Sequence, residues 1–147
     1  MNTKRIARLK AALVRESKHT AVGALGEQLA AELFSQDYTV QHNRPGQHRG
    51  DLTIIDTNTG ESYHVEVKTT RRCKSDKKWH FQLWKDGKTD HRHSDYVLLI
   101  AVHITGDVTL FLVPCQELSS IQHTSMEHPD KYAGKFACYR KRGALTL

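Results

Sequence analysis

The chain has 147 residues, of which 26% are charged and 38% hydrophobic, with a formal charge of +6 and ten histidines. This length suits one domain with a single core, and this composition excludes a disordered chain. The pI near 9.3 favours a polyanionic partner over an acidic one. No segment approaches the length of a membrane span and the N-terminus lacks an apolar signal segment, so we expect a cytoplasmic protein without a membrane anchor.

Three cysteines, Cys73, Cys115 and Cys138, lie far apart, without a CxxC pair or a Cys/His zinc spacing. The tract at 91–93 contains His91 and His93 but no further ligands at a useful spacing. The sequence therefore predicts reduced thiols and no metal site of the Cys/His type.

Two helices are expected first. Residues 3–17 form a basic helix whose apolar side carries Ile6, Leu9, Leu13 and Val14. Its basic side is open to two interpretations, a solvated face or direct contact with phosphates. Thr20 is the expected N-cap of a second helix over 21–36, and Glu27 lies at the edge of its apolar stripe.

Strands are expected after the helices. Alternating or continuous apolar runs predict strands over 37–43, 51–56, 62–70, 79–84, 94–104 and 106–114. The run at 94–104 is almost continuously apolar, which is typical of a strand covered on both faces. A helix is expected to begin within 116–121, and the basic tail from residue 123 has little periodicity.

The two strands at 51–56 and 62–70 carry charges on one face. Joined by a four-residue loop over 57–60, they place Asp56 opposite Glu61, and the same register brings Asp51 opposite Glu66. Opposed side chains have Cβ atoms about 4.5–5.5 Å apart, where two like charges are destabilising. A cation is therefore expected between Asp51 and Glu66.

Carboxylates without soft ligands suit a hard divalent cation such as Mg²⁺, with Mn²⁺ as a substitute. The backbone carbonyl of Val67 is expected to complete the ligand set. Lys68 lies about 7 Å beyond Glu66 on the same face, where it can orient water or neutralise charge on a phosphate. The blander interpretation is a surface hairpin whose charges face solvent, but Glu27 on the preceding helix favours a phosphodiesterase site.

Three stretches, "GALGEQLAAELF", "RGDLTII" and "HVEVKTT", resemble the PD-(D/E)XK nuclease superfamily over residues 20–118. The resemblance implies an α/β fold with a restriction-endonuclease-like core, a mixed central β-sheet flanked by α-helices in the order α-β-β-β-α-β. It also implies metal-dependent DNA cleavage. Asp51 and Glu66 match the metal-binding acids and Lys68 the catalytic lysine. Glu27 matches an additional helix carboxylate that holds the ion through water or tunes the acids.

One position departs from this pattern, because Gly50 stands where the family has a proline before the aspartate. Two subgroups of this superfamily are similar to the chain. They are the archaeal-type Holliday junction resolvases and the small group I intron-associated endonucleases, and the pattern of the second subgroup covers more of the chain. A non-catalytic DNA-binding module on the same fold is the alternative function.

A basic segment follows the predicted catalytic strand, and we expect it to contact DNA phosphates. The expected contacts are Arg71, Arg72, Lys74, Lys77, Lys78 and Gln82. His48, His64 and His80 are more simply structural or solvated, and Trp79 and Trp84 are interpreted as packing residues.

The whole chain, 1–147, is expected to form one nuclease domain with a core at 20–118, a basic N-terminal helix and a basic tail at 123–147. Double-strand cutting by one small site usually needs two copies, which favours a homodimer. RNA as a substrate is left open.

Overall fold

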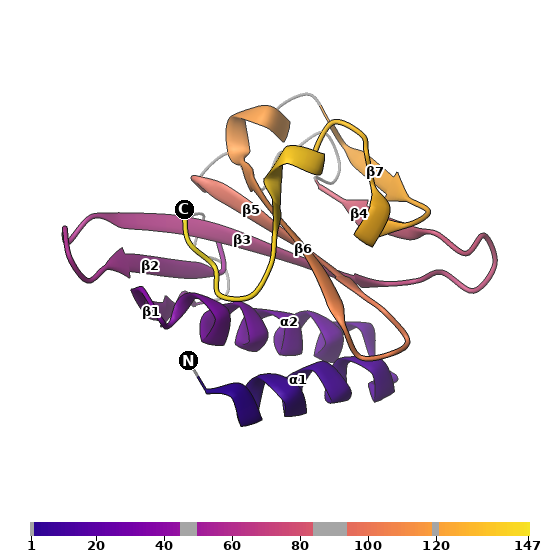
Figure 1. The fold of residues 1–147 in the computed structure, drawn as a ribbon, viewed down its shortest axis with the longest axis horizontal. Helices are drawn as coiled ribbons and strands as arrows, with labels where there is room; N and C mark the ends of the chain where they lie inside the picture. Colours follow the sequence, from indigo (N-terminus) through magenta and orange to yellow (C-terminus); the bar gives the residue numbers. More distant parts are fainter. Residues whose placement is uncertain (1, 45–49, 84–93, 119–120) are drawn as a thin grey trace.

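The computed structural model describes residues 2–44, 50–83, 94–118 and 121–147. Its centre is a six-stranded sheet in the order β1-β2-β3-β5-β6-β8, and β4 and β7 form a separate two-stranded sheet. Helices α1 and α2 lie on one face of the large sheet, and the small sheet lies on the other (Figure 1). The helices and strands are α1 (Thr3–Arg15), α2 (His19–Phe34), β1 (Tyr38–His42), β2 (Leu52–Asp56), β3 (Ser62–Arg71), β4 (Trp79–Gln82), β5 (Tyr96–Val102), β6 (Val108–Pro114), β7 (His123–Met126) and β8 (Arg140–Lys141).

Both predicted helices form, but the predicted cap of the second is wrong. The Asn2 side chain caps α1 by accepting a hydrogen bond from the Arg5 N–H at 3.0 Å. Helix α2 begins at His19, so Thr20 lies inside its first turn. The N-cap residue is Lys18, whose extended backbone presents its carbonyl to the Val22 N–H at 3.0 Å.

The predicted hairpin register is confirmed within the strands. Leu52 pairs with Val65 and Ile55 with Ser62, in the register expected from a four-residue loop. The pairing ends at Leu52, however, one residue earlier than predicted. Asp51 is therefore not a ladder partner of Glu66, and β2 separates from β3 at this point.

The remaining strands extend the sheet around β3. Strand β5 runs parallel to β3, and β6 is antiparallel to β5. All residues of Val97–Val102 in β5 are buried, which confirms the expectation of a strand covered on both faces. The connection from β3 to β5 contains strand β4 in its described part, where the resemblance noted in the sequence implied a helix. Residues 84–93 of this connection lie outside the described residues.

The C-terminal part has more structure than its sequence predicts. Residues Cys115–Leu118 form a single 3-10 turn instead of the start of an α-helix. Strand β7 pairs with β4, and β8 pairs with β6. These strands are too short to give a readable alternation, and their pairing partners lie far away in sequence.

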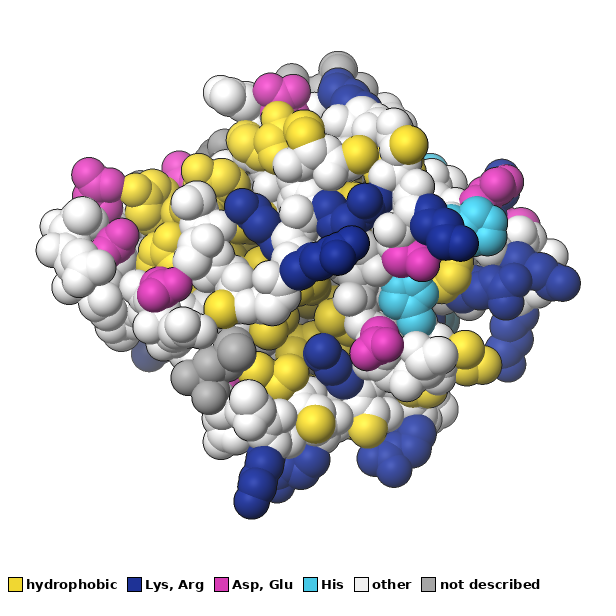
Figure 2. Space-filling view, viewed as in Figure 1, with side chains coloured by type: hydrophobic (Ala, Val, Ile, Leu, Met, Phe, Trp, Pro, Cys, Tyr) yellow, Lys and Arg dark blue, Asp and Glu magenta, His cyan; other side chains and the backbone are white. Residues whose placement is uncertain are grey.

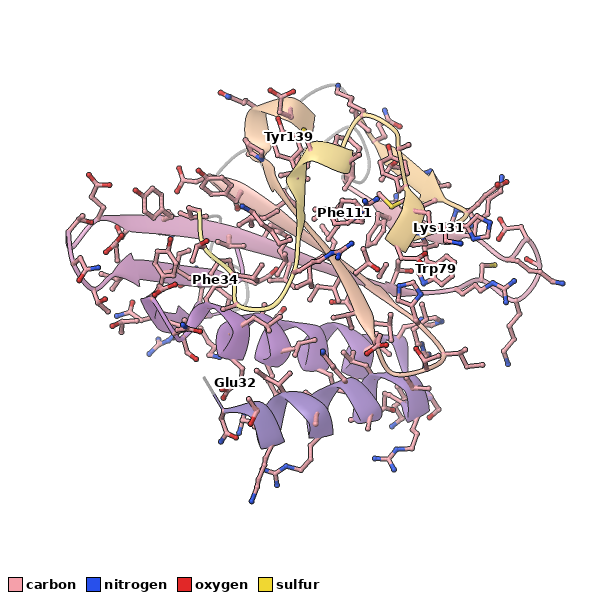
Figure 3. All side chains as sticks on the ribbon, in the orientation of Figure 1. Glu32, Phe34, Trp79, Phe111, Lys131 and Tyr139 are labelled. Carbon is pink, nitrogen blue, oxygen red and sulfur yellow. The ribbon has the colours of Figure 1, made fainter. Side chains whose placement is uncertain are left out.

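Two hydrophobic cores hold the layers together, one on each face of the large sheet. The first packs Phe34 of α2 and three apolar residues of α1 (Ile6, Leu9, Leu13) against the sheet, and Leu145 of the tail joins it. The second contains Trp79 and Phe111 on the side of the small sheet (Figure 3). The Trp79 indole N–H donates to the Val102 carbonyl at 2.9 Å, so the interpretation of Trp79 as a packing residue is confirmed. No helix in the described residues is long and apolar enough to span a membrane.

Candidate active site

Asp51 lies at a fork where β2 separates from β3. Its backbone N–H donates to the Val65 carbonyl at 2.9 Å. Its side-chain Oδ2 accepts the Val67 N–H at 2.7 Å. The carboxylate thus takes the place of the backbone acceptor that a neighbouring strand would supply, and it is held at the open edge of β3.

The backbone conformation of Gly50 allows the chain to turn into this fork. Its φ is +83°, which a proline cannot adopt and which other L residues rarely adopt. A β-carbon at this position would lie 2.6 Å from Ser94 Oγ and 2.8 Å from the Val65 carbonyl oxygen. A glycine is therefore required at this position by the backbone that presents Asp51.

A hydrogen-bond network anchors the start of β2. Asn43 donates its backbone N–H to the Asp51 carbonyl at 2.9 Å and its side-chain amide to the Gly50 carbonyl at 3.1 Å. The Thr53 hydroxyl donates to Asn43 Oδ1 at 2.9 Å, and His64 Nδ1 lies 3.1 Å from the same hydroxyl. His64 therefore supports the fork from the side, as a structural residue. Sequence reasoning missed Asn43, because nothing in the local pattern links it to Gly50.

Glu66 and Lys68 project from the same face of β3, because they alternate with the buried Val65 and Val67. Lys68 Nζ lies 3.4 Å from Glu66 Oε1, and the two side chains are 26% and 14% exposed. The Val67 carbonyl points toward the same edge of the strand as the Val67 N–H, which faces Asp51. The structure thus directs the Val67 carbonyl toward the fork, beside the Asp51 carboxylate.

Glu27 reaches this region from α2 because the helix backbone approaches β3 closely. A β-carbon on the preceding Gly26 would lie 1.8 Å from Thr69 Oγ1 and 2.8 Å from Thr69 Cβ. Burial raises the pKa of Glu27 to about 7, and the nearby charge of Asp51, a hydrogen bond between the two side chains and the charge of Glu66 add to this effect. Three carboxyl groups therefore influence one another here, with one ammonium group beside them.

This donor set fits a hard divalent cation. The groups at the fork are carboxylate oxygens of Glu27, Asp51 and Glu66 and the backbone carbonyl of Val67, without thiolate or imidazole ligands among them. Burial is the main cause of the raised pKa of Glu27, and the charges of Asp51 and Glu66 add to it. The repulsion between these carboxyl groups favours cation binding, since a cation relieves it. The negative charge at the fork and its oxygen ligands therefore both favour a hard divalent cation.

The basic residues predicted to contact DNA lie around the connection from β3 to β4, and some are already engaged. The Arg71 guanidinium donates to the carbonyl of Glu16, which ends α1. Arg72 Nε donates to the Lys77 carbonyl at 3.3 Å, and Lys78 Nζ lies 3.9 Å from Glu127 Oε1. Lys74 and Gln82 are exposed. Figure 2 shows lysine and arginine side chains at this end of the molecule.

A cleft of about 880 Å³ lies away from the fork. It runs between the turn after β3 and the C-terminal strand, and its lining includes Arg72, Lys77, Arg140, Lys141 and Arg142. None of the four predicted catalytic residues lines it. The candidate catalytic groups therefore lie outside this cleft.

His48, Trp84, His91 and His93 lie outside the described residues. Sequence reasoning missed that Cys73, Asp76 and His80 come together, with ligand atoms within 4.8 Å of one another. The missed signal was the spacing Cys-x2-Asp-x3-His, in which an aspartate stands where a zinc pattern has a second cysteine or histidine.

Comparison with known proteins supports the fold. No protein-family model and no curated protein matches the chain. Among solved structures, the fold is similar to that of a bacterial homing endonuclease, I-Ssp6803I, with a TM-score of 0.62 and 17% sequence identity. The match covers 85% of this chain and 88% of that one. The mixed α/β fold of this chain, with its six-stranded sheet and two helices, is therefore similar to that of a homing endonuclease.

Proposed function

We propose that the protein is a metal-dependent DNA endonuclease with a site of the PD-(D/E)XK type. The observation that carries this proposal is the convergence of Glu27, Asp51 and Glu66 at the fork, with Lys68 Nζ 3.4 Å from Glu66. The likeness of the fold to a homing endonuclease supports it. The cleaved bond is a phosphodiester, and the reaction is a hydrolysis.

Each residue has a distinct role in this proposal. Asp51, Glu66 and the Val67 carbonyl hold Mg²⁺, with Mn²⁺ as a substitute, and Glu27 holds it through water or tunes the acids. When bound, the ion stabilises negative charge on the scissile phosphate and lowers the pKa of water. Lys68 orients the attacking water and donates a hydrogen bond to the charge that grows on the phosphate oxygens. Asp51 keeps its place through the Val67 N–H and so fixes the ligand geometry.

DNA binding in this proposal rests on charge. The formal charge is +6, and basic side chains gather around the end of β3 and along β8, where Figure 2 shows them on one face. Lysine and arginine contacts to phosphates position a duplex without reading its sequence. A homodimer would supply the two sites that a double-strand cut requires.

The test is nicking of supercoiled plasmid by the full chain in Mg²⁺, in Mn²⁺ and in excess EDTA. The proposal predicts nicked or linear product with either ion and none with EDTA. Salt-sensitive binding to plasmid without nicking under any ion would contradict it and favour a DNA-binding module on the same fold. Synthetic four-way junctions compared with linear duplexes of equal length then separate a junction-resolving nuclease from a general or site-specific one.

A further inference from the structure

A second group of potential metal ligands lies on the turn between β3 and β4. Cys73 offers Sγ, Asp76 a carboxylate oxygen and His80 a ring nitrogen, and these atoms all lie within 4.8 Å of one another. Cys73 and His80 are half-buried and Asp76 is exposed. The group differs in composition and place from the carboxylates of the fork, which lie further back along β3.

The backbone of this turn holds the three side chains on one side. The Cys73 N–H donates to the Lys78 carbonyl at 2.8 Å, and the Lys77 N–H donates to the Cys73 carbonyl at 2.9 Å. Lys77 has a φ of 61°, the single positive φ among the described non-glycine residues. This left-handed residue reverses the chain tightly, and strand β4 follows the turn (Figure 1). His80 is the second residue of β4.

The imidazole of His80 is oriented by two partners. Its Nδ1 lies 2.8 Å from Ser125 Oγ on β7, and its Nε2 lies 2.6 Å from Asp76 Oδ2. The second oxygen of Asp76 accepts the Lys78 N–H at 3.0 Å. Metal-binding histidines commonly have one ring nitrogen fixed by such an outer partner, so that the other nitrogen points at the ion. Here Ser125 fixes Nδ1 and leaves Nε2 directed at the cluster.

The surroundings of the Cys73 thiol and the Asp76 carboxyl group lower the pKa of each. A hydrogen bond from the Ser75 hydroxyl lowers the pKa of Cys73, with backbone N–H groups of Asp76 and Ser75 adding to the effect. The hydrogen bond from the Lys78 N–H lowers the pKa of Asp76. Metal ions bind thiolate and carboxylate, so both shifts favour the forms that act as ligands.

We propose that Cys73, Asp76 and His80 bind one Zn²⁺ ion, with a water molecule in the fourth position. A thiolate with an imidazole selects zinc over magnesium, which prefers oxygen ligands. In a tetrahedral zinc site the ligand atoms lie about 3.3–3.8 Å apart, given bond lengths of about 2.0–2.3 Å. The side chains therefore need to move by about 1 Å, and the Asp76–His80 hydrogen bond is replaced by two bonds to the ion.

Such an ion would fix the turn that carries the basic residues. Cys73 and Asp76 belong to the turn, whereas His80 belongs to β4 and is held to β7 through Ser125. Lys74, Lys77 and Lys78 lie on the same turn. Zinc binding at this place is independent of the proposed nuclease activity, because its ligands do not include any residue of the fork.

The test uses Co²⁺ in place of Zn²⁺, since a thiolate bound to Co²⁺ gives a charge-transfer band in the near ultraviolet that oxygen ligands do not give. The full chain is stripped of metal under reducing conditions and titrated with Co²⁺ in excess Mg²⁺, which occupies the oxygen ligands of the fork. We expect this band to saturate at one Co²⁺ per chain and to disappear when one equivalent of Zn²⁺ is added. An absent band, or a band that Zn²⁺ does not displace, would contradict the proposal.

Three single-residue variants test whether the ion binds at this turn. Cys73→Ser should remove the band and weaken Zn²⁺ binding by more than about 100-fold, since losing an outer partner alone costs about 10–100-fold. Ser125→Ala should keep the band and weaken binding within that smaller range. Cys138→Ser, at an exposed cysteine elsewhere, is the matched control and should leave band and affinity unchanged. A band that survives Cys73→Ser, or one lost in Cys138→Ser, would overturn the assignment, with circular dichroism verifying that each variant is folded.

Discussion

The fork at Asp51 and the turn at Cys73 are two clusters of potential ligands on the same long strand and its continuation, built in opposite ways. The fork gathers oxygen ligands of like charge on strands and a helix, where burial and repulsion raise the pKa of Glu27 to about 7. The turn gathers a thiol, a carboxylate and an imidazole that hydrogen-bond to one another and to backbone N–H groups.

This difference in ligand charge determines how each cluster depends on a cation. Among the described residues, the ligand atoms of the turn lie within 4.8 Å of one another, whereas the fork does not supply a trio as compact as this. The unlike groups of the turn attract one another without an ion, whereas the carboxyl groups of the fork repel one another when ionised, and a cation relieves this repulsion. We therefore expect the fork to be sensitive to pH and divalent cations, and the turn to be largely preformed.

The largest expected effect is on catalysis at the fork. Lys68→Met keeps the length of the side chain and removes its charge, so nicking should fall by about 10²–10⁴-fold, the usual contribution of a group that assists proton transfer. DNA binding without divalent cations should remain within a few-fold of the wild type. Single-turnover nicking measures the loss, and Lys4→Met, at an exposed lysine of α1, is the control. An unchanged rate for Lys68→Met would remove Lys68 from the site.

The next effect concerns the close approach of α2 to β3. Gly26→Ala places a β-carbon on Thr69, so the free energy of unfolding should fall by about 1–3 kcal/mol. Gly23→Ala, in the same helix, meets no atom within 4 Å and should raise it by about 0.5–1 kcal/mol. Urea unfolding of both variants measures the contrast. Equal effects would show that close packing at Gly26 does not position Glu27.

Glu27 should make the stability of the fork depend on pH. Its pKa is about 7 in the folded protein against an ordinary 4.5, so between these values the folded state binds the proton and the unfolded state does not. Without divalent cations, its contribution to stability is present below pH 4.5 and is lost as the pH rises to 7. Glu27→Gln should remove this component, measured as the difference between the two unfolding profiles in EDTA. Parallel profiles would contradict the assignment.

The smallest effect is expected at the basic turn. Lys74 is exposed and forms no ion pair with another described residue, so Lys74→Ala should leave the stability within about 0.5 kcal/mol of the wild type. If Lys74 contacts a phosphate, the slope of log affinity for DNA against log salt concentration should fall by about 1. Fluorescence anisotropy with a labelled duplex at several salt concentrations measures this slope. An unchanged slope would mean that Lys74 remains solvated in the complex.

The candidate site residues at the fork could be predicted from the sequence, because strand alternation and hairpin register are local patterns that extend over several residues. The register across 57–60 followed from loop length alone, and the order of Val65, Glu66, Val67 and Lys68 separated core from site. The register could not show that pairing stops at Leu52, because that depends on Gly50 and on packing against Ser94. The turn cluster was missed because it depends on the positive φ of Lys77 and on contact with Ser125, which is 45 residues away from His80.

The most direct test of the fork as the catalytic site compares two aspartates of the same hairpin. Asp51→Asn changes a predicted metal ligand, whereas Asp56→Asn changes the far end of β2, where the side chain accepts hydrogen bonds from the Asn58 and Thr59 N–H groups. In single-turnover nicking with Mg²⁺, we predict that Asp51→Asn loses at least about 100-fold in rate, on the scale of removing one strong electrostatic contact to the transition state, and still binds DNA. Asp56→Asn should cleave like the wild type. Wild-type cleavage by Asp51→Asn would contradict the account.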